Sequence, residues 1–307
     1  MRSSVFRMLT LLVAAIGYSA CGDDDPTSPP PPAAAMNLTL ALTGAEPLTD
    51  GAHYEGWAIV GGAPVSTGKF NVSAAGGLED LTGAPITVFT TATDISTATA
   101  IVISIEPDGD TDATPSDTKF MAGAVASLAA PLSVGSSDAL GDDFTGAAGK
   151  YILASPTDDP TANDNSGIWF LDNSSGTPEA GLTVATLPAG WQYEGWVVID
   201  GTPVSTGRFT DPAAADLAAP HSESTNPAPP FPGEDFLLNA PTGLTFPTDI
   251  AGATAVISIE PEPDFSAMPF TLKPLTHAID AAATTGVVYD MDNSAGDLPT
   301  GSATISS

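Results

Sequence analysis

Residues 53–70 read HYEGWAIVGGAPVSTGKF, and residues 192–209 read QYEGWVVIDGTPVSTGRF. The two segments match at most positions, which excludes coincidence and indicates an internal duplication. In each segment, two short runs with apolar residues flank a Gly- and Pro-containing turn, which is typical of two β-strands joined by that turn. The chain is therefore expected to contain two copies of one β module.

Two further blocks repeat in the same order along the chain. Residues 100–107 (AIVISIEP) correspond to residues 254–261 (TAVISIEP). Residues 167–174 (GIWFLDNS) correspond to residues 286–294 (GVVYDMDNS), and this third pair is expected to close each unit.

The predicted fold class is all-β, with two tandem β-sandwich modules of Greek-key-like connection. Short β-branched runs bounded by Gly, Pro, Asn and Asp favour such sandwiches, and the frequency of Pro and Gly argues against long helices. We place module 1 at residues 36–146 and module 2 at residues 147–307. Residues 218–233 are interpreted as a long loop present only in the second copy.

The beginning of the chain has the pattern of a lipoprotein signal. Basic residues precede a short apolar run, which is typical of a secretion signal and shorter than the roughly 20 apolar residues that span a bilayer. Tyr18-Ser19-Ala20-Cys21 resembles the bacterial lipobox, although the family usually has an aliphatic residue where Tyr18 stands. We expect a signal peptide at 1–20, then lipidated Cys21 and a Pro-rich linker at 21–35.

This interpretation places the protein outside the cytoplasm, anchored to a membrane by lipid and not spanning it. If the host has two membranes, Gly22 beside the lipidated cysteine favours the outer membrane, by resemblance to known lipoproteins. Cys21 is the only cysteine, so it has no partner for an intramolecular disulfide or a thiolate metal site.

The charge balance disfavours two classes of partner. The chain has 7 Lys and Arg against 37 Asp and Glu. Nucleic acids and anionic lipid headgroups are both bound through Lys and Arg, so neither is an expected partner beyond the lipid anchor itself. The acidity is compatible with cationic partners or divalent metals, but we favour solubility as its explanation.

At the repeated blocks the chain resembles the extracytoplasmic C-terminal domain of the anti-sigma-K factor family. The matching residues are Tyr54, Trp57, Pro64, Gly68, Glu106 and Pro107 in the first copy and Tyr193, Trp196, Pro203, Gly207, Glu260 and Pro261 in the second. The family usually continues after Glu-Pro with a Gly-rich segment, which 108–110 keeps in part and 262–264 loses.

That resemblance implies an ectodomain that senses a signal or contacts a protein. Such anti-sigma factors also carry a cytoplasmic helical domain and a transmembrane helix, and neither is recognisable here. Direct contact with a cytoplasmic sigma factor is therefore not expected.

The repeated acidic residues are candidate chemistry. Glu55 and Glu194 precede the repeated tryptophans, and Glu106 and Glu260 end the Ile/Val runs. Paired carboxylates can act as general acid and base, as in glycoside hydrolysis, if they are held across a substrate. A buried hydrogen bond that fixes the sandwich explains them as well, and we favour that structural role.

Other candidate sites are weaker. Asp158, Asp159 and Asp164 lie in a stretch that could offer oxygen ligands to calcium, but it lacks the EF-hand spacing, and we favour an ordinary turn there. Ser66 to Lys69 and Ser116 to Lys119 have Ser-x-x-Lys spacing without the companion motifs of serine acyl-transferases. Among the histidines His53, His221 and His277, no pair has metal-ligand spacing.

The sequence thus predicts a non-enzymatic, cofactor-free envelope protein that contacts an unidentified protein or senses a signal. A calcium- or polysaccharide-binding surface module is the alternative, and a hydrolase using the repeated glutamates is a third hypothesis.

Overall fold

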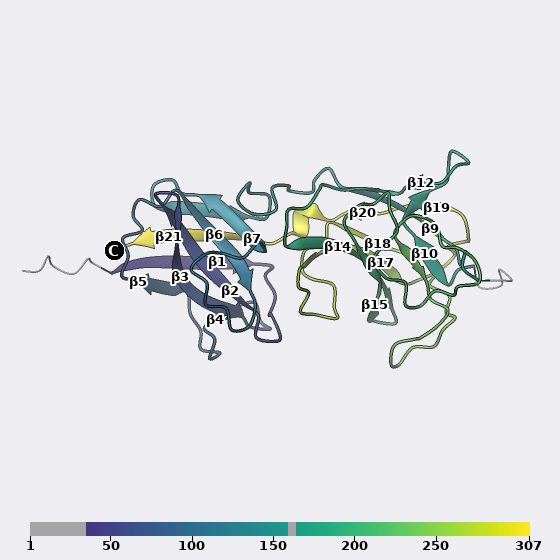
Figure 1. Cartoon of the computed structure of the whole chain (residues 1–307), viewed down its shortest axis with the longest axis horizontal. Helices are drawn as coiled ribbons and strands as arrows, with labels where there is room; N and C mark the ends of the chain where they lie inside the picture. Colours follow the sequence, from purple (N-terminus) through teal and green to yellow (C-terminus); the bar gives the residue numbers. More distant parts are fainter. Residues whose placement is uncertain (1–34, 159–163) are drawn as a thin grey trace, which may run out of the picture. The chain divides into compact units, whose positions relative to one another are not determined.

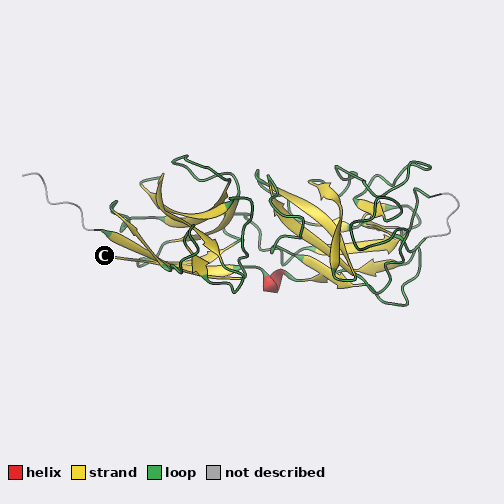
Figure 2. Ribbon diagram, turned by 90° about the horizontal axis from the view of Figure 1, so that it is seen from below, coloured by secondary structure: helices red, strands yellow, loops and turns green. Residues whose placement is uncertain are grey.

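Both repeated segments form β-hairpins. In the computed structural model, which describes residues 35–158 and 164–307, β2 (His53–Val60) pairs with β3 (Ala63–Val72), and β14 (Trp191–Ile199) pairs with β15 (Thr202–Phe209). Strands dominate the described residues (Figures 1 and 2), and the one helical element among them is the short 3-10 helix η1 (Ala295–Asp297). The all-β prediction is confirmed.

The first hairpin belongs to a nine-stranded antiparallel sheet. Its order is β4-β3-β2-β6-β7-β8-β21-β1-β5. The remaining strands of this sheet are β1 (Met36–Thr43), β4 (Leu78–Glu79), β5 (Val88–Thr91), β6 (Ala100–Glu106), β7 (Lys119–Ala124), β8 (Ala129–Ser133) and β21 (Thr300–Ser306). The sheet curls on itself, because the ring of Phe89 on β5 lies 5.3 Å from that of Phe70 on β3, near the opposite edge.

The second hairpin belongs to a five-stranded sheet of order β15-β14-β17-β18-β20, with β17 (Thr254–Pro261), β18 (Leu275–Ala278) and β20 (Asp292–Asn293). A second sheet has the order β13-β9-β10-β16, and β19 also pairs with β9. Its strands are β9 (Ala148–Leu153), β10 (Gly167–Trp169), β13 (Leu182–Thr183), β16 (Gly233–Asp235) and β19 (Val288–Asp290). The short strands β11 (Leu171–Asp172) and β12 (Glu179–Ala180) pair with each other.

Side chains of the two sheets in the second half meet as in a β-sandwich. The hydroxyl of Tyr151 on β9 forms a 2.8 Å hydrogen bond with His277 Nδ1 on β18, and the centroids of these two rings lie 5.8 Å apart. The sandwich character expected for this part of the chain is confirmed.

Strand β21 changes the expected division of the chain. Residues Thr300–Ser306 pair with β1 on one side and β8 on the other, so they belong to the first sheet although the sequence placed them in module 2 at 147–307. Ala303 and Ile305 are buried there, and the burial of these apolar side chains favours the pairing of β21 with the first sheet. The second half is thus inserted between β8 and β21, and the described residues belong to one compact unit.

The sequence suggested that the third repeated block closes each unit, and the structure differs from this expectation. Its first copy contains β10 and its second copy contains β19, and both pair with β9 in the same sheet. Both copies of this block thus pair with one strand. The repeat in the sequence does not distinguish this arrangement from one in which each copy ends a separate module.

The repeated aromatic residues occupy opposite faces of their strand, because side chains alternate along a β-strand. Tyr54 lies in the main apolar core with Ile103 and Ile105 of β6, whereas Trp57 packs in a smaller cluster with Val102 and Ala139. As a result β6 is buried along its whole length.

The predicted signal peptide, Cys21 and the linker up to residue 34 lie outside the described residues. Within the part of the chain that is described, the structure contains no helix of the length and apolar character needed to cross a membrane.

Candidate functional site

In the first copy the repeated carboxylates lie on the sheet face opposite the main core. Glu55 on β2 stands directly across from Ser104 on β6. The indole Nε1 of Trp57 donates to Ser104 Oγ at 2.7 Å, and Ser104 Oγ in turn donates to Glu106 Oε1. Only 2% of Glu55 and 1% of Glu106 is exposed. We name this Trp-Ser-Glu arrangement the indole relay.

The second copy reproduces the relay. Trp196 Nε1 donates to Ser258 Oγ at 2.8 Å, and Ser258 Oγ donates to Glu260 Oε1. Glu194 stands across from Ser258, as Glu55 does from Ser104. The duplicated sequence therefore builds a duplicated hydrogen-bond network.

Each relay also fastens the loop that follows its strand. Glu106 Oε1 accepts the N–H of Ser116 at 3.0 Å, and Glu260 Oε1 accepts the N–H of Phe270 at 2.9 Å. In both copies the bond joins residues ten positions apart. Glu106 and Glu260 thus each bind a backbone N–H of the loop that follows.

The other repeated glutamates accept hydrogen bonds from the neighbouring strand. Ser66 donates to Glu55 Oε1, and Ser205 donates to Glu194 Oε1. The Ser66 hydroxyl therefore donates to a carboxylate, and the Ser116 hydroxyl donates to the carbonyl of Ile105. Neither serine is bonded to the lysine of its Ser-x-x-Lys motif.

The cation beside these glutamates differs between the copies. Lys69 Nζ lies 3.5 Å from Glu55 Oε2 and 3.3 Å from Asp110 Oδ2. Its counterpart Arg208 pairs with Glu262 Oε2 at 3.0 Å. Glu194 Oε2 is buried without a hydrogen-bond partner.

Burial changes the protonation of the two repeated glutamates in the second copy. Desolvation raises the pKa of Glu194 to about 7 and that of Glu260 to about 8, against the opposing effect of the serine hydrogen bonds. The negative charge of Glu194 raises the pKa of Glu260 further. Both side chains therefore hold protons at pH values where exposed glutamates are ionised.

The repeated tyrosines also have internal partners. Tyr54 Oη donates to the carbonyl of Glu46 at 2.9 Å, and Tyr193 Oη donates to the carbonyl of Ala185 at 2.8 Å. The residues singled out by the repeat are thus engaged with the protein itself.

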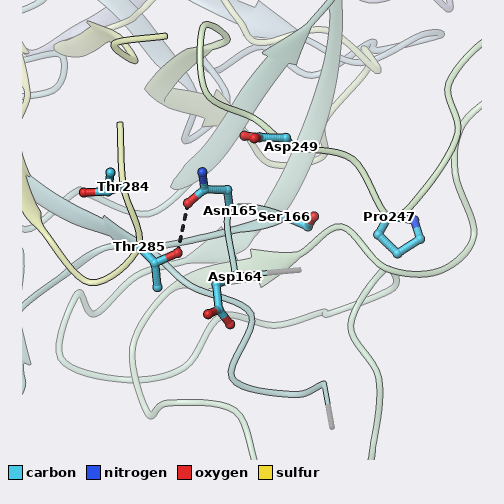
Figure 3. A pocket seen from close by; sticks show the side chains of 7 residues that line it. All are labelled: Asp164, Asn165, Ser166, Pro247, Asp249, Thr284 and Thr285. Carbon is cyan, nitrogen blue, oxygen red and sulfur yellow. Dashed lines mark hydrogen bonds between the residues drawn. The ribbon is translucent and has the colours of Figure 1, made fainter. Parts of the chain in front are cut away.

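An open, acidic pocket of about 570 Å³ lies elsewhere in the second half (Figure 3). It is lined by Asp164, Asn165, Ser166, Pro247, Asp249, Thr284 and Thr285. Thr285 Oγ1 donates to Asn165 Oδ1 at 2.9 Å. Neither the four repeated glutamates nor Asp158 lines this pocket.

Of the predicted calcium ligands in the described residues, Asp164 lines this pocket and Asp158 does not. Figure 3 shows the carboxylates of Asp164 and Asp249 apart from each other. Asp159 lies outside the described residues. Within residues 35–158 and 164–307 no three His, Cys, Asp or Glu side chains form a group that could hold a metal ion.

The three histidines lie apart in different surroundings. His53 is buried with Nδ1 at 3.2 Å from the carbonyl of Gly51, His221 Nδ1 lies 3.2 Å from the carbonyl of Leu238, and His277 contacts Tyr151.

Sequence reasoning missed a buried acidic cluster on β16. Asp235 is fully buried and accepts hydrogen bonds from Trp169 Nε1 at 2.8 Å and from the N–H of Thr157 at 2.8 Å. Its neighbour Glu234 accepts from Ser222 Oγ, and burial raises the pKa of Glu234 to about 7. The signal was an acidic pair at the end of the loop found only in the second copy, but its tryptophan partner lies far away in sequence.

Much of the acidic composition serves turns. In many turns an aspartate Oδ1 accepts the N–H two residues later, a common stabilising arrangement. These aspartates are Asp80, Asp94, Asp110, Asp142, Asp143, Asp172, Asp211, Asp249, Asp264 and Asp280. Hydrogen bonds from Thr82 and Ala84 hold the pKa of Asp80 below its usual value.

No protein-family model, curated protein or solved structure matches this chain.

Proposed function

We propose that this chain is a lipid-anchored protein of the cell envelope whose duplicated β architecture contacts another protein or senses a signal, without catalysing a reaction. The indole relay is the observation that carries this proposal. Both copies keep Trp, Ser and Glu as internal supports, so the repeat preserves a scaffold. A scaffold with differing loops is the usual arrangement of a binding protein.

The resemblance to anti-sigma-K ectodomains supports contact or sensing as the role. Tyr54 and Trp57, with Tyr193 and Trp196, carry that resemblance and are buried. We propose no direct contact with a cytoplasmic sigma factor, because an extracytoplasmic anchor would keep the two apart. The partner would be another envelope protein, and no cofactor is required.

Localisation rests on Cys21, which two or more acyl chains would fix to a membrane. In a host with two membranes, we propose the outer membrane.

Expression of the full gene in bacteria tests this proposal. Wild type and Cys21→Ala would be compared by membrane fractionation and by mass of the processed protein. The proposal expects an acylated, membrane-bound wild type and a soluble variant. An unmodified, soluble wild type would overturn the anchor.

Partner capture tests the role itself. Photo-crosslinking residues placed at exposed Leu217 and Leu238 would mark proteins that approach the second half, and exposed Leu81 serves as the comparison position in the first half. A defined envelope protein crosslinked from one face supports contact. Turnover of a glycoside substrate that Glu194→Gln abolishes would favour the hydrolase hypothesis.

The second candidate is the binding of calcium or of a polysaccharide, and the acidic pocket is a place where oxygen ligands gather. Its lining has two carboxylates, an amide and three hydroxyl groups, which are oxygen ligands that calcium accepts. Calcium should then raise the melting temperature of wild type and not of Asp164→Asn/Asp249→Asn, with Asp297→Asn as control. Equal responses of all three proteins would contradict calcium binding at the pocket.

A further inference from the structure

Three side chains in the first copy are placed for a covalent bond. Lys69 on β3 stands directly across from Glu55 on β2, and its Nζ lies 3.5 Å from Glu55 Oε2. The same Nζ lies 3.3 Å from Asp110 Oδ2 and donates to the carbonyl of Asp110 at 2.7 Å. A lysine amine, an aspartate carboxyl and a glutamate carboxyl thus meet at one point.

The protein shields this point from water to a large extent. Side-chain exposure is 3% for Glu55, 9% for Asp110 and 30% for Lys69. Glu55 Oε2 is buried and has no hydrogen-bond partner, although Oε1 accepts from Ser66. Its free oxygen is therefore available to exchange a proton with Lys69.

The loop that carries Asp110 is held in place. Asp110 follows β6, and its Oδ1 accepts the N–H of Asp112 at 3.1 Å. The N–H of Asp110 donates to the carbonyl of Pro107 at 3.3 Å. Groups fixed near each other in this way react far faster than the same groups free in solution.

We propose that Lys69 and Asp110 form an intramolecular isopeptide bond, with Glu55 as the proton carrier. Glu55 takes a proton from the Lys69 ammonium, and the free amine attacks Cγ of Asp110. The new Nζ–Cγ bond forms as one Cγ–O bond breaks. The departing oxygen leaves as water with two of the three ammonium protons, so the chain becomes about 18 Da lighter and no oxidant is needed.

The reaction needs a proton carrier because Asp110 is ionised before the bond forms. Burial raises the pKa of Asp110, but the N–H of Asp112 and the charge of Lys69 outweigh it and hold this pKa below its usual value. Asp110 thus begins as a carboxylate, whose oxygen leaves only after it is protonated. Glu55 and the buried His53, whose charge also acts on Asp110, are the titratable groups beside the pair.

The second copy provides a natural comparison. Glu194 and Asp264 occupy the positions of Glu55 and Asp110, but Arg208 replaces Lys69. A guanidinium is always protonated and is a poor nucleophile, so no equivalent bond forms there. The bond would thus belong to the first copy alone.

Trypsin digestion of the denatured full chain tests the proposal, because trypsin does not cleave after an acylated lysine. Wild type should resist cleavage after Lys69. It should give a peptide ending at Lys119 that is about 18 Da lighter than its linear sequence. Fragmentation should then join position 69 to position 110. Lys69→Arg keeps the charge and should be cleaved at position 69 with no mass loss.

Two further variants separate the roles. Asp110→Ala should restore cleavage after Lys69, and Glu55→Gln should do so while keeping the shape of the side chain. A wild type that is cleaved after Lys69 and has its linear mass overturns the proposal. A wild-type crosslink that Glu55→Gln forms at the same rate overturns the role of Glu55.

Discussion

Trp57 and Ser104 join neighbouring strands by a 2.7 Å hydrogen bond from the indole Nε1 to the hydroxyl oxygen. Because Ser104 also donates to Glu106, one hydroxyl links the indole to the carboxylate that holds the following loop. Trp196 and Ser258 repeat this relationship in the second copy. The serine is thus the central element of each relay, although it is the smallest member.

Removal of this hydroxyl should destabilise the fold. Ser104→Ala leaves the Trp57 Nε1 buried without an acceptor and removes a donor from Glu106, which costs about 1–3 kcal/mol of unfolding free energy. Ser258→Ala should behave alike. Urea unfolding measures both, and Ser137→Ala at an exposed position is the control. Equal midpoints for all variants would show that the relays contribute nothing measurable.

Stability should fall as pH rises through the neutral range. The folded state raises the pKa of Glu194 to about 7 and that of Glu260 to about 8, above the ordinary glutamate value of 4.5. Between pH 4.5 and 8 the folded protein therefore binds more protons than the unfolded chain, and its stability declines across that window. Buried Glu234 and half-buried Asp216, each with a pKa of about 7, act in the same direction.

Melting temperatures at pH 5.5, 7 and 8.5 check this dependence. Glu260→Gln removes one titrating group and should flatten the decline, whereas Glu179→Gln at an exposed position should leave it unchanged. A melting temperature that increases from pH 5.5 to 8.5 would contradict the protonated state of these side chains.

Loss of the Asp235 carboxylate should disrupt the second half. Asp235→Ala leaves Trp169 Nε1 and the N–H of Thr157 buried without acceptors, at a cost of about 3 kcal/mol. Asp235→Asn retains one acceptor oxygen and should cost less. Hydrogen exchange of β10 and β16 reports the effect, and equal protection in both variants and wild type would show that the carboxylate is dispensable.

Deletion of residues 300–307 should open the first sheet between β1 and β8. Both strands would lose a hydrogen-bonded neighbour, and the sites filled by Ala303 and Ile305 would be emptied. Exchange should therefore accelerate in β1 and β8 and remain slow in β14 and β17. Deletion of Ser307 alone is the control, since this residue is exposed and lies outside the strand. Unchanged exchange in β1 would contradict the pairing.

Local patterns predicted the elements well. The duplicated hairpins and the buried Ile/Val strands β6 and β17 lie where the repeats placed them, because turn residues and apolar runs act over short distances. Glu106 and Glu260 accept the N–H groups of Ser116 and Phe270. These bonds span only ten residues.

Long-range pairing could not be obtained in the same way. The apolar residues of 300–306 show that a strand can form, but they do not specify which sheet it enters. The union of Asp235 with Trp169 likewise depends on a register between strands 66 residues apart. Both relationships arise from the global fold, and neither leaves a local pattern.

The position of β21 has a consequence for biogenesis. A ribosome produces β1 to β8 early, yet the hydrogen-bonding edges of β1 and β8 that face each other across β21 have no partner until residues 300–306 emerge. The last strand of the second half is β20, which ends at Asn293. Every strand of its sheets has therefore been synthesised before residues 300–306. Maturation therefore runs against the direction of synthesis: the part translated first is the part finished last, and a nascent chain carries two open strand edges throughout translation of the inserted half.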